Sequence, residues 1–483
     1  PPPERSVNAP LPPRWVWAVG LALGLFLAAA VAWEQYALLA VPVVLAVVWF
    51  AFVRLDWLVL AVVAMTPLSV TLQDRGFNVG LSLPTEPLLF GITLLLFFRL
   101  IMTGRINREV AKHPVSLAIY FYLGWMLLTS ITSSMPLVSI KHWVARVWFV
   151  VPYFFLLVHV FQRKSYRELF FWLYLIPLAV AVAYTLSVHA QYDFSKQTST
   201  WVMFPFFKEH TVYGAALALY IPAALYFALR KQSLLSRMGT GFLFSLLVVG
   251  LVYSFTRAAW LSLVAASGIF LIHRLRISWS VVLFLGLIGL GGLYTIKDQV
   301  QRSAERNKAV SSDQLGEHVA SMSNISTDAS NLERLNRWNS ALRMFQERPW
   351  TGWGPGTYQF QYAPFQHSYD LTIISTNAGD NGNAHSEYIG PLAEEGVLGL
   401  LAVLLLLATF LRTGAAVLPH YREKSASFAA DYWLAVAAAT GLVTYFTHGV
   451  LNNFLDTDKA SAPVWGFAAL LVALDLQKRK EMN

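Results

Sequence analysis

Residues 383–400 read Asn-Ala-His-Ser-Glu-Tyr-Ile-Gly-Pro-Leu-Ala-Glu-Glu-Gly-Val-Leu-Gly-Leu, a stretch that joins a long polar segment to an apolar run continuing through Phe410. The run is long enough to cross a membrane, so a membrane helix is expected to begin beside His385 and Ser386. An imidazole at this border can exchange protons with water and still act in a medium of low dielectric. His385 is therefore the first candidate for a catalytic group.

The composition of the chain indicates an integral membrane protein. Of its 483 residues, 56% are hydrophobic and only 13% are charged, which is too apolar for an ordinary soluble enzyme. Cysteine is absent from the sequence, which excludes disulfides, thiolate metal sites and a cysteine nucleophile. The formal charge of +9 comes mostly from short loops between apolar runs, so it is interpreted as a topology signal and not as a nucleic-acid site.

The apolar runs predict an all-α polytopic membrane protein with about 14 transmembrane helices, and about 12 is the alternative. The runs lie at Val16–Val31, Leu38–Val53, Trp57–Leu72, Pro84–Met102, Val115–Ile131, His142–Phe161, Leu169–Val188, Val212–Leu229, Gly241–Phe255, Ala258–His273, Ser278–Tyr294, Tyr388–Leu411, Ala429–Phe446 and Pro463–Leu476. The first run has small residues at Ala28–Ala32 that would suit a cleaved signal peptide, but it is interpreted as a retained helix. The two runs around Ser254 have the alternative of a hairpin that does not fully cross.

Clusters of Lys and Arg in the loops set the expected orientation. They fall on one side of the membrane if the number of spans is even, and the positive-inside rule assigns that side to the cytoplasm, together with both termini. The clusters are Arg105, Arg108 and Lys112; Arg163, Lys164 and Arg167; Arg230, Lys231 and Arg237; Arg274 and Arg276; Arg412, Arg422 and Lys424; and Lys478, Arg479 and Lys480.

A single large hydrophilic insertion divides the chain into three parts: residues 1–295 with the first membrane helices, 296–386 as a large outer loop, and 387–483 with the last helices. The length of this insertion predicts a small outer domain or lid. Within it, Leu332, Leu335, Trp338, Leu342 and Phe345 recur at helical spacing and predict an amphipathic helix ended by Pro349. The following Gly352–Gly356 reads as a tight turn, and Trp353 in it is free to pack on the membrane surface or on a sugar.

Arg257 is the second candidate of the first rank. It lies between two apolar runs, on the side that the loop charges assign to the outside. A guanidinium there is costly without an anionic partner, and Arg matches the oxygens of a diphosphate in a bidentate manner. The alternative is an Arg that extends to the lipid headgroups.

Weaker candidates surround these two. Arg334 and Arg337 lie one helical turn apart and have the spacing to reach the same anion, whereas a solvated helix face is expected for Arg343. Arg146 follows His142 by one turn, and Lys208 and His210 precede a span, so these four are candidates for an anionic cleft. Asp456 and Asp458 form a D-x-D pair, which is an unspecific signal for a divalent metal, and no metal is expected. Nucleotide and redox signatures are absent from the sequence, so no cofactor is expected.

Two spaced patterns carry a resemblance to a known family. His385 and Ser386 are followed after nine residues by Gly396 and then by Gly399, and Arg257 is followed by Leu261 in an Arg-x3-Leu element. On these residues the chain resembles the O-antigen ligase and polymerase superfamily, over roughly residues 204–411. Lys208 and His210 stand where ligases often place a further Arg, and the span count exceeds the 12 expected of a ligase.

The resemblance implies a helical enzyme of the GT-C type in the bacterial inner membrane, with its active site facing the periplasm. Such enzymes pass an undecaprenyl-diphosphate-linked glycan en bloc to a sugar hydroxyl, with inversion and without metal or nucleotide. His385 would be the general base, and Arg257 would stabilise the diphosphate leaving group. Arg334, Arg337, Lys208, His210, Arg146, Ser386 and Trp353 would contact the diphosphate or the glycan.

No motif in the sequence identifies the acceptor. A ligase would use lipid A core, a polymerase would use a growing chain on the same lipid carrier, and an exopolysaccharide or protein acceptor is a further alternative. A flippase for lipid-linked glycans is the alternative of another class. It would need basic residues open to both leaflets and no large outer loop, so the insertion favours an enzyme.

Overall fold

The computed structural model describes residues 21–73 except 22–23, 27, 30, 36–37 and 39, and residues 80–274, 329–372, 375, 382–422 and 429–482. These residues are mostly helical. The predicted span Ser278–Tyr294 and the first part of the outer loop lie outside the described residues. The chain divides into two compact units, residues 1–58 and residues 59–483.

The smaller unit contains α2 (Ala40–Val53), which agrees with the run predicted from Leu38. The helix ends where Arg54 follows, and the guanidinium of Arg54 donates from Nε to Asp56 Oδ1 at 3.3 Å. The predicted first run, Val16–Val31, falls in large part outside the described residues.

The run predicted as a span at Trp57–Leu72 is not one helix, and that prediction was wrong. Helix α3 (Leu55–Met65) ends in a short 3₁₀ turn, η2 (Thr66–Leu68), in which Pro67 has no N–H to continue the ladder. The chain then forms β1 (Val70–Gln73), which pairs antiparallel with β2 (Gly80–Leu83) in the register Val70 to Leu83. Hydropathy does not separate such a helix and hairpin from a span, because both are apolar.

The larger unit is a helix bundle. In the described residues, eight helices are long and apolar enough to cross a membrane. They are α4 (Thr85–Thr103), α6 (Pro114–Ile131), the continuous α7, η3 and α8 (Pro136–Val160), α9 (Lys164–Ala190), α10 (His210–Leu229), α11 (Leu234–Tyr253), α17 (Ile389–Arg422) and α19 (Asp458–Met482). Two further helices, α12 (Arg257–Arg274) and α18 (Ala429–His448), pack among them, and α5 (Arg108–Ala111) is a single turn. The protein is therefore a polytopic membrane protein, as predicted.

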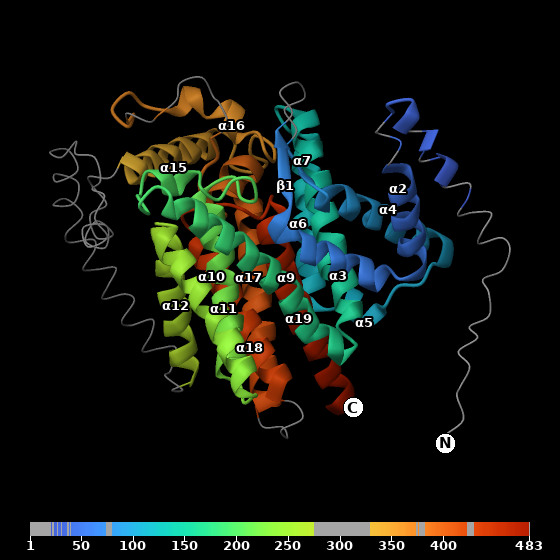
Figure 1. Ribbon diagram of the computed structural model, residues 1–483. Coiled ribbons are helices and arrows are strands. Elements are labelled where there is room, and N and C mark those ends of the chain that lie inside the picture. Colours follow the sequence, from blue (N-terminus) through green and yellow to red (C-terminus); the bar gives the residue numbers. More distant parts are fainter. Residues whose placement is uncertain are drawn as a thin grey trace, which may run out of the picture. The chain divides into compact units, whose positions relative to one another are not determined.

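The core of the bundle forms around α19, which is almost entirely buried. Its Trp465 is inaccessible to solvent, and Phe467 stacks on Phe171 of α9 with ring centroids 5.2 Å apart. Helix α18 packs on α10, α12, α17 and α19 (Figure 1). Small residues allow the close approach of these helices, as in Gly441 of α18, which faces the carbonyl of Leu219 in α10.

One end of this bundle is held by ion pairs among the basic clusters. Arg167 lies 3.1 Å from Asp431, and Arg230 lies 2.6 Å from Glu168. Near the end of α19, Lys480 pairs with Glu109 at 3.0 Å. The loops that precede α9, α11 and α18 and the end of α19 therefore lie at the same end, as the topology prediction requires. The assignment of that end to the cytoplasm stays a prediction.

Candidate active site

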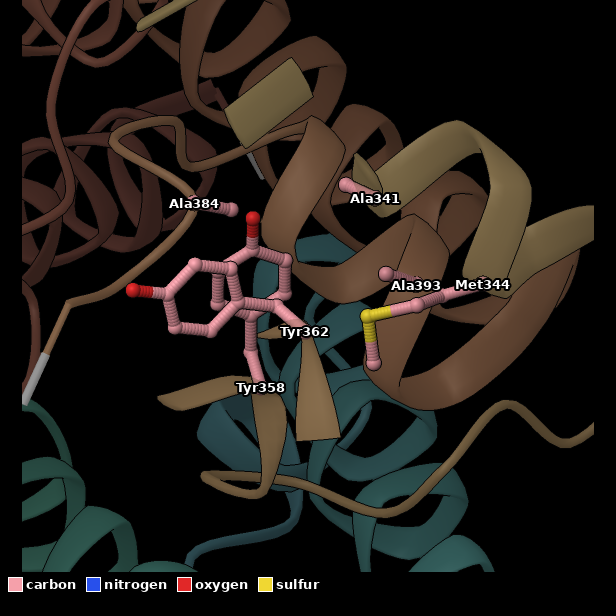
Figure 2. Packing of buried hydrophobic residues seen from close by; sticks show 6 residues of the cluster. All are labelled: Ala341, Met344, Tyr358, Tyr362, Ala384 and Ala393. Carbon is pink, nitrogen blue, oxygen red and sulfur yellow. The ribbon is translucent and has the colours of Figure 1, made fainter. Parts of the chain in front are cut away.

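The outer segment folds as a small layer over the bundle. Helix α15 (Ala329–Glu347) lies across one end of the helices and packs on α17 (Figure 1). It is followed by α16 (Tyr358–Gln361) and the 3₁₀ turn η5 (Ala363–Phe365). Buried residues from these elements and from α17 form one cluster, shown in Figure 2: Ala341, Met344, Tyr358, Tyr362, Ala384 and Ala393.

The predicted amphipathic helix is present. Leu335 and Leu342 of its apolar stripe are 40% and 41% exposed. The buried face is largely polar, with Arg337 donating to Glu333 Oε1 at 2.9 Å and Asn336 donating to Gln366 at 2.7 Å. The buried charge of Arg337 is therefore paired with that of Glu333. The polar face of α15 is thus turned toward the chain that carries His385.

Arg337 connects α15 directly to that chain. Its Nη1 donates to the carbonyl of Asn383 at 3.2 Å, and its guanidinium lies over the ring of Tyr362 at 5.2 Å. Tyr358 donates from its hydroxyl to the carbonyl of Arg337 at 2.8 Å and stacks on Tyr362, with Ala384 beside the two rings (Figure 2). Arg337 therefore holds the backbone two residues before His385.

The segment from Pro349 to Gly354 explains the glycine of the motif. At Gly396 the backbone has φ 72° and ψ −166°, so α17 is broken there. Val397 donates to the carbonyl of Pro349 at 2.9 Å, and Gly354 donates to that of Glu394 at 2.7 Å. A side chain at position 396 would collide with the carbonyl of Trp350. The backbone of the Pro349–Gly354 segment approaches α17 closely at this glycine.

Trp353 and Arg343 have structural contacts in the outer segment. The indole of Trp353 donates to the carbonyl of Met344 at 3.1 Å, and Arg348 lies 4.0 Å from its ring. A contact of Trp353 with a sugar stays a prediction. Arg343, expected on a solvated face, instead pairs with Asp370 at 2.6 Å and is only 22% exposed.

His385 and Ser386 form the entry to α17. His385 has a left-handed backbone with φ 48°, and its N–H donates to Asn383 Oδ1 at 3.0 Å. The hydroxyl of Ser386 accepts from the N–H groups of Tyr388 and Ile389, both at 3.3 Å, which is the contact of a helix cap. Ser386 thereby fixes the start of the helix immediately after the imidazole.

The environment of His385 favours its neutral form. Burial lowers its pKa to about 3, and the positive charges of Arg334 and Arg337 contribute to this shift. Arg334 also donates from Nε to the carbonyl of Leu451 at 3.3 Å, in the loop after α18. The imidazole is therefore unprotonated at neutral pH, as a general base must be before it accepts a proton, but with so low a pKa it is a weak base in the protein without substrate.

Glu387 is a residue that sequence reasoning missed. One of its carboxylate oxygens accepts from the hydroxyl of Tyr445, from Phe454 N at 2.8 Å and from Leu455 N at 3.0 Å. Its own N–H donates to Gly449 O at 2.7 Å. Burial raises the pKa of Glu387, which the charge of Arg146 opposes. Glu387 ties the His385 chain to the end of α18 and the loop before α19, and no local pattern marks such a contact.

Arg146 lines a small pocket beside the His385 chain. It is 6% exposed, and Glu387, Glu394, Glu395 and Asp456 line the same pocket. His142, one turn earlier on α7, also lines it, as does Ser386. Contact of Arg146 with the diphosphate or the glycan stays a prediction.

Arg257 and His210 begin α12 and α10, and Lys208 precedes α10. Thr256 donates to the carbonyl of His210 at 2.9 Å, so the starts of α10 and α12 are adjacent. Leu219 of α10 faces Gly441 of α18. Leu219 lies nine residues after His210, where α10 starts, and Gly441 lies seven residues before His448, where α18 ends. The starts of α10 and α12 and the end of α18 therefore lie at one end of the bundle. Leu261 of the Arg-x3-Leu element is 47% exposed and contributes little to the core. A shared diphosphate between Arg257 and His385 stays a prediction.

The two aspartates of the D-x-D pair have separate contacts. Asp458 accepts from the hydroxyls of Ser69 and, at 2.7 Å, Thr85, which fixes the start of α19. Asp456 is exposed and lines the pocket of Arg146. Among the described residues no group of three His, Asp or Glu side chains is arranged to hold a metal ion.

Comparison with known proteins bears on the part of the chain that contains these residues. Residues 242–404 match the family model described as O-antigen ligase, which covers about a third of the chain. A comparison with curated proteins gave no match. The matched range includes Arg257, His385, Gly396 and Gly399, the residues on which the sequence resemblance was based. The resemblance is thereby confirmed over residues 242–404, which are similar to the O-antigen ligase family.

Proposed function

We propose that the protein is an inner-membrane glycosyltransferase that moves an undecaprenyl-diphosphate-linked glycan en bloc to a sugar hydroxyl on the periplasmic side. The observation that carries this proposal is His385 itself. It lies in the matched domain, at the start of α17, next to two arginines and in its neutral form. A neutral imidazole at the border of a membrane helix is suited to accept the proton of an acceptor hydroxyl.

The reaction needs few groups from the protein. The acceptor oxygen forms a bond to the anomeric carbon of the donor glycan as the bond from that carbon to the diphosphate oxygen breaks. The hydroxyl proton passes to His385, and the diphosphate leaves with the electron pair on its lipid. A base, positive charge at the leaving group and alignment are sufficient, since the donor already carries its leaving group.

Positive charge for the diphosphate is assigned to Arg257, with Arg334, Lys208 and His210 as further contacts. Arg257 begins α12 beside the start of α10, which His210 opens and Lys208 precedes. Arg334 lies close enough to lower the pKa of His385. Arg337 has a supporting role, because its guanidinium already pairs with Glu333 and with the carbonyl of Asn383. The proposed reaction uses no metal.

The acceptor we propose first is lipid A core, as in an O-antigen ligase. A polymerase that extends a glycan on the same carrier is the second candidate, and the matched family supports both equally. A flippase is disfavoured because the outer segment packs onto the bundle through α15 and supports His385.

The experiment that tests this proposal gives the purified protein a lipid-linked glycan together with lipid A core or with more donor. Glycan on lipid A core identifies a ligase, and longer glycan on the lipid carrier identifies a polymerase. Absence of both products, with the glycan moved across a vesicle membrane instead, contradicts the proposal and favours the flippase.

A further inference from the structure

The pocket that Arg146 lines contains polar atoms with no partner among the described residues. Nε and Nη1 of Arg146 are buried and make no hydrogen bond, and the same holds for Glu395 Oε2 and Asn453 Oδ1. Buried polar groups are nearly always paired in folded proteins. Four such atoms on one pocket therefore offer hydrogen-bond partners to a polar ligand.

Arg146 is the group among these that most needs a hydrogen-bonded partner. Its side chain is 94% buried, ten residues into α7, and it lies 6.0 Å from the ring of Tyr122. The neighbouring carboxylate of Glu387 is already used, because one of its oxygens accepts three hydrogen bonds from Tyr445, Phe454 and Leu455. A guanidinium in this position is expensive without a hydrogen-bonded partner.

The mixture of free donors and free acceptors limits the ligand. The lining mixes the guanidinium of Arg146 with the carboxyl groups of Glu387, Glu394, Glu395 and Asp456, so it offers neither a phosphate nor a cation a surface of one opposite charge. A hydroxyl group can accept from the guanidinium and donate to a carboxylate or an amide oxygen at the same time. Tyr122 and Tyr358 also line the pocket and offer aromatic surface. These properties fit the hydroxyl-rich edge of an uncharged sugar.

The position of the pocket indicates which sugar this is. Asn383, Ala384, Ser386 and Glu387 line it, so residues on both sides of His385 in the sequence contribute to the pocket, although the imidazole itself does not line it. The proposed general base must reach the hydroxyl of the acceptor, which in an inverting transfer attacks from the side opposite the leaving group. Because the pocket adjoins the base, the sugar assigned to it is the acceptor.

We propose that the pocket of Arg146, Glu395 and Asn453 binds the terminal sugar of the acceptor through its hydroxyl groups. This inference rests on the proposed function, because it assigns one of the two substrates of that reaction. It narrows the role first expected for Arg146, which was contact with the diphosphate or the glycan.

The test is a pair of kinetic titrations on the purified protein, with the acceptor varied at saturating donor and the donor varied at saturating acceptor. In Arg146→Gln the KM for the acceptor should rise about tenfold or more, since a charge-assisted hydrogen bond is lost, and the KM for the donor should stay within about twofold. Asn453→Ala should raise the acceptor KM in the same direction by a smaller factor. Arg230→Gln, at the other end of the bundle, is the matched control and should change neither constant.

The outcomes separate the two proposals. A rise in donor KM instead of acceptor KM in Arg146→Gln would place the diphosphate in the pocket and overturn the inference, and unchanged constants in a folded variant would do so as well. If Arg146→Gln does not fold, Asn453→Ala decides by the same criterion. A second measurement, the binding of lipid A core to the protein in nanodiscs without donor, does not depend on turnover. Equal binding by wild type and Asn453→Ala overturns the inference even if the transfer reaction itself is never observed.

Discussion

The break in α17 at Gly396 gives a prediction whose size follows from the structure. Its backbone, at φ 72° and ψ −166°, lies in a region that is open almost only to glycine, so alanine there costs about 1–3 kcal/mol in strain. An added Cβ would also lie 2.7 Å from the carbonyl oxygen of Pro349 and closer still to that of Trp350. The backbone must then shift, and the hydrogen bond from Val397 to Pro349, about 0.5–1.5 kcal/mol, is lost.

Gly396→Ala should therefore lower the free energy of unfolding by about 1.5–4.5 kcal/mol. The substitution should weaken the contact between α17 and the Pro349–Gly354 segment, so the rate of glycan transfer should decrease as well. The matched control is Gly124→Ala in α6, where an added Cβ has no atom within 4 Å and where helical alanine is neutral or favourable.

The assay is thermal and denaturant-induced unfolding of both variants in the same detergent, followed by the transfer reaction. If Gly396→Ala is as stable and as active as Gly124→Ala, the reasoning about this break is refuted. A variant that is less stable yet fully active would show that the break supports folding and does not position His385.

Three further predictions concern the site. Because the pKa of His385 is lowered to about 3, the imidazole of the free enzyme stays neutral as the pH falls from 8 to 5. The value of kcat/KM should therefore show no fall with a midpoint near 6.5. A pH profile with that midpoint would contradict the assignment. Arg257→Lys should raise the KM for the donor about tenfold, because lysine cannot bind a diphosphate in a bidentate manner. Arg237→Lys, at the end of the bundle that carries the basic clusters, is the control. If both variants have the same KM for the donor, Arg257 only reaches the lipid headgroups. Ser386→Ala removes the acceptor of two N–H groups at the start of α17 and should cost about 1 kcal/mol of stability, measured against Ser187→Ala on an exposed position of α9; no difference between them would refute the capping role.

Local patterns in the sequence predicted the helices and the entry to α17. The apolar run after Tyr388, the helix ended before Pro349 and the position of His385 at a membrane border all follow from spacing and composition over a few turns. The same rules failed at Trp57–Leu72, since an apolar 3₁₀ turn and strand have the hydropathy of a span.

Contacts between distant parts of the chain were beyond these patterns. Glu387 meets Tyr445 and the loop before α19, and nothing near Glu387 in the sequence indicates this. The buried face of α15 is polar because Arg337 and Asn336 find partners from later segments. Arg146 was predicted to contact a substrate from its position one turn after His142, and only the fold brings four acidic side chains to it.

The most direct measurement of the central claim is the rate of transfer from a lipid-linked glycan by His385→Ala, compared with wild type and with His367→Ala. His367 is an exposed histidine of the same outer segment and serves as the control. Loss of a general base should reduce the rate by about 10²–10⁴-fold at unchanged expression and folding, whereas His367→Ala should keep the wild-type rate. A His385→Ala variant that transfers glycan at the wild-type rate would contradict the assignment of His385 as the base.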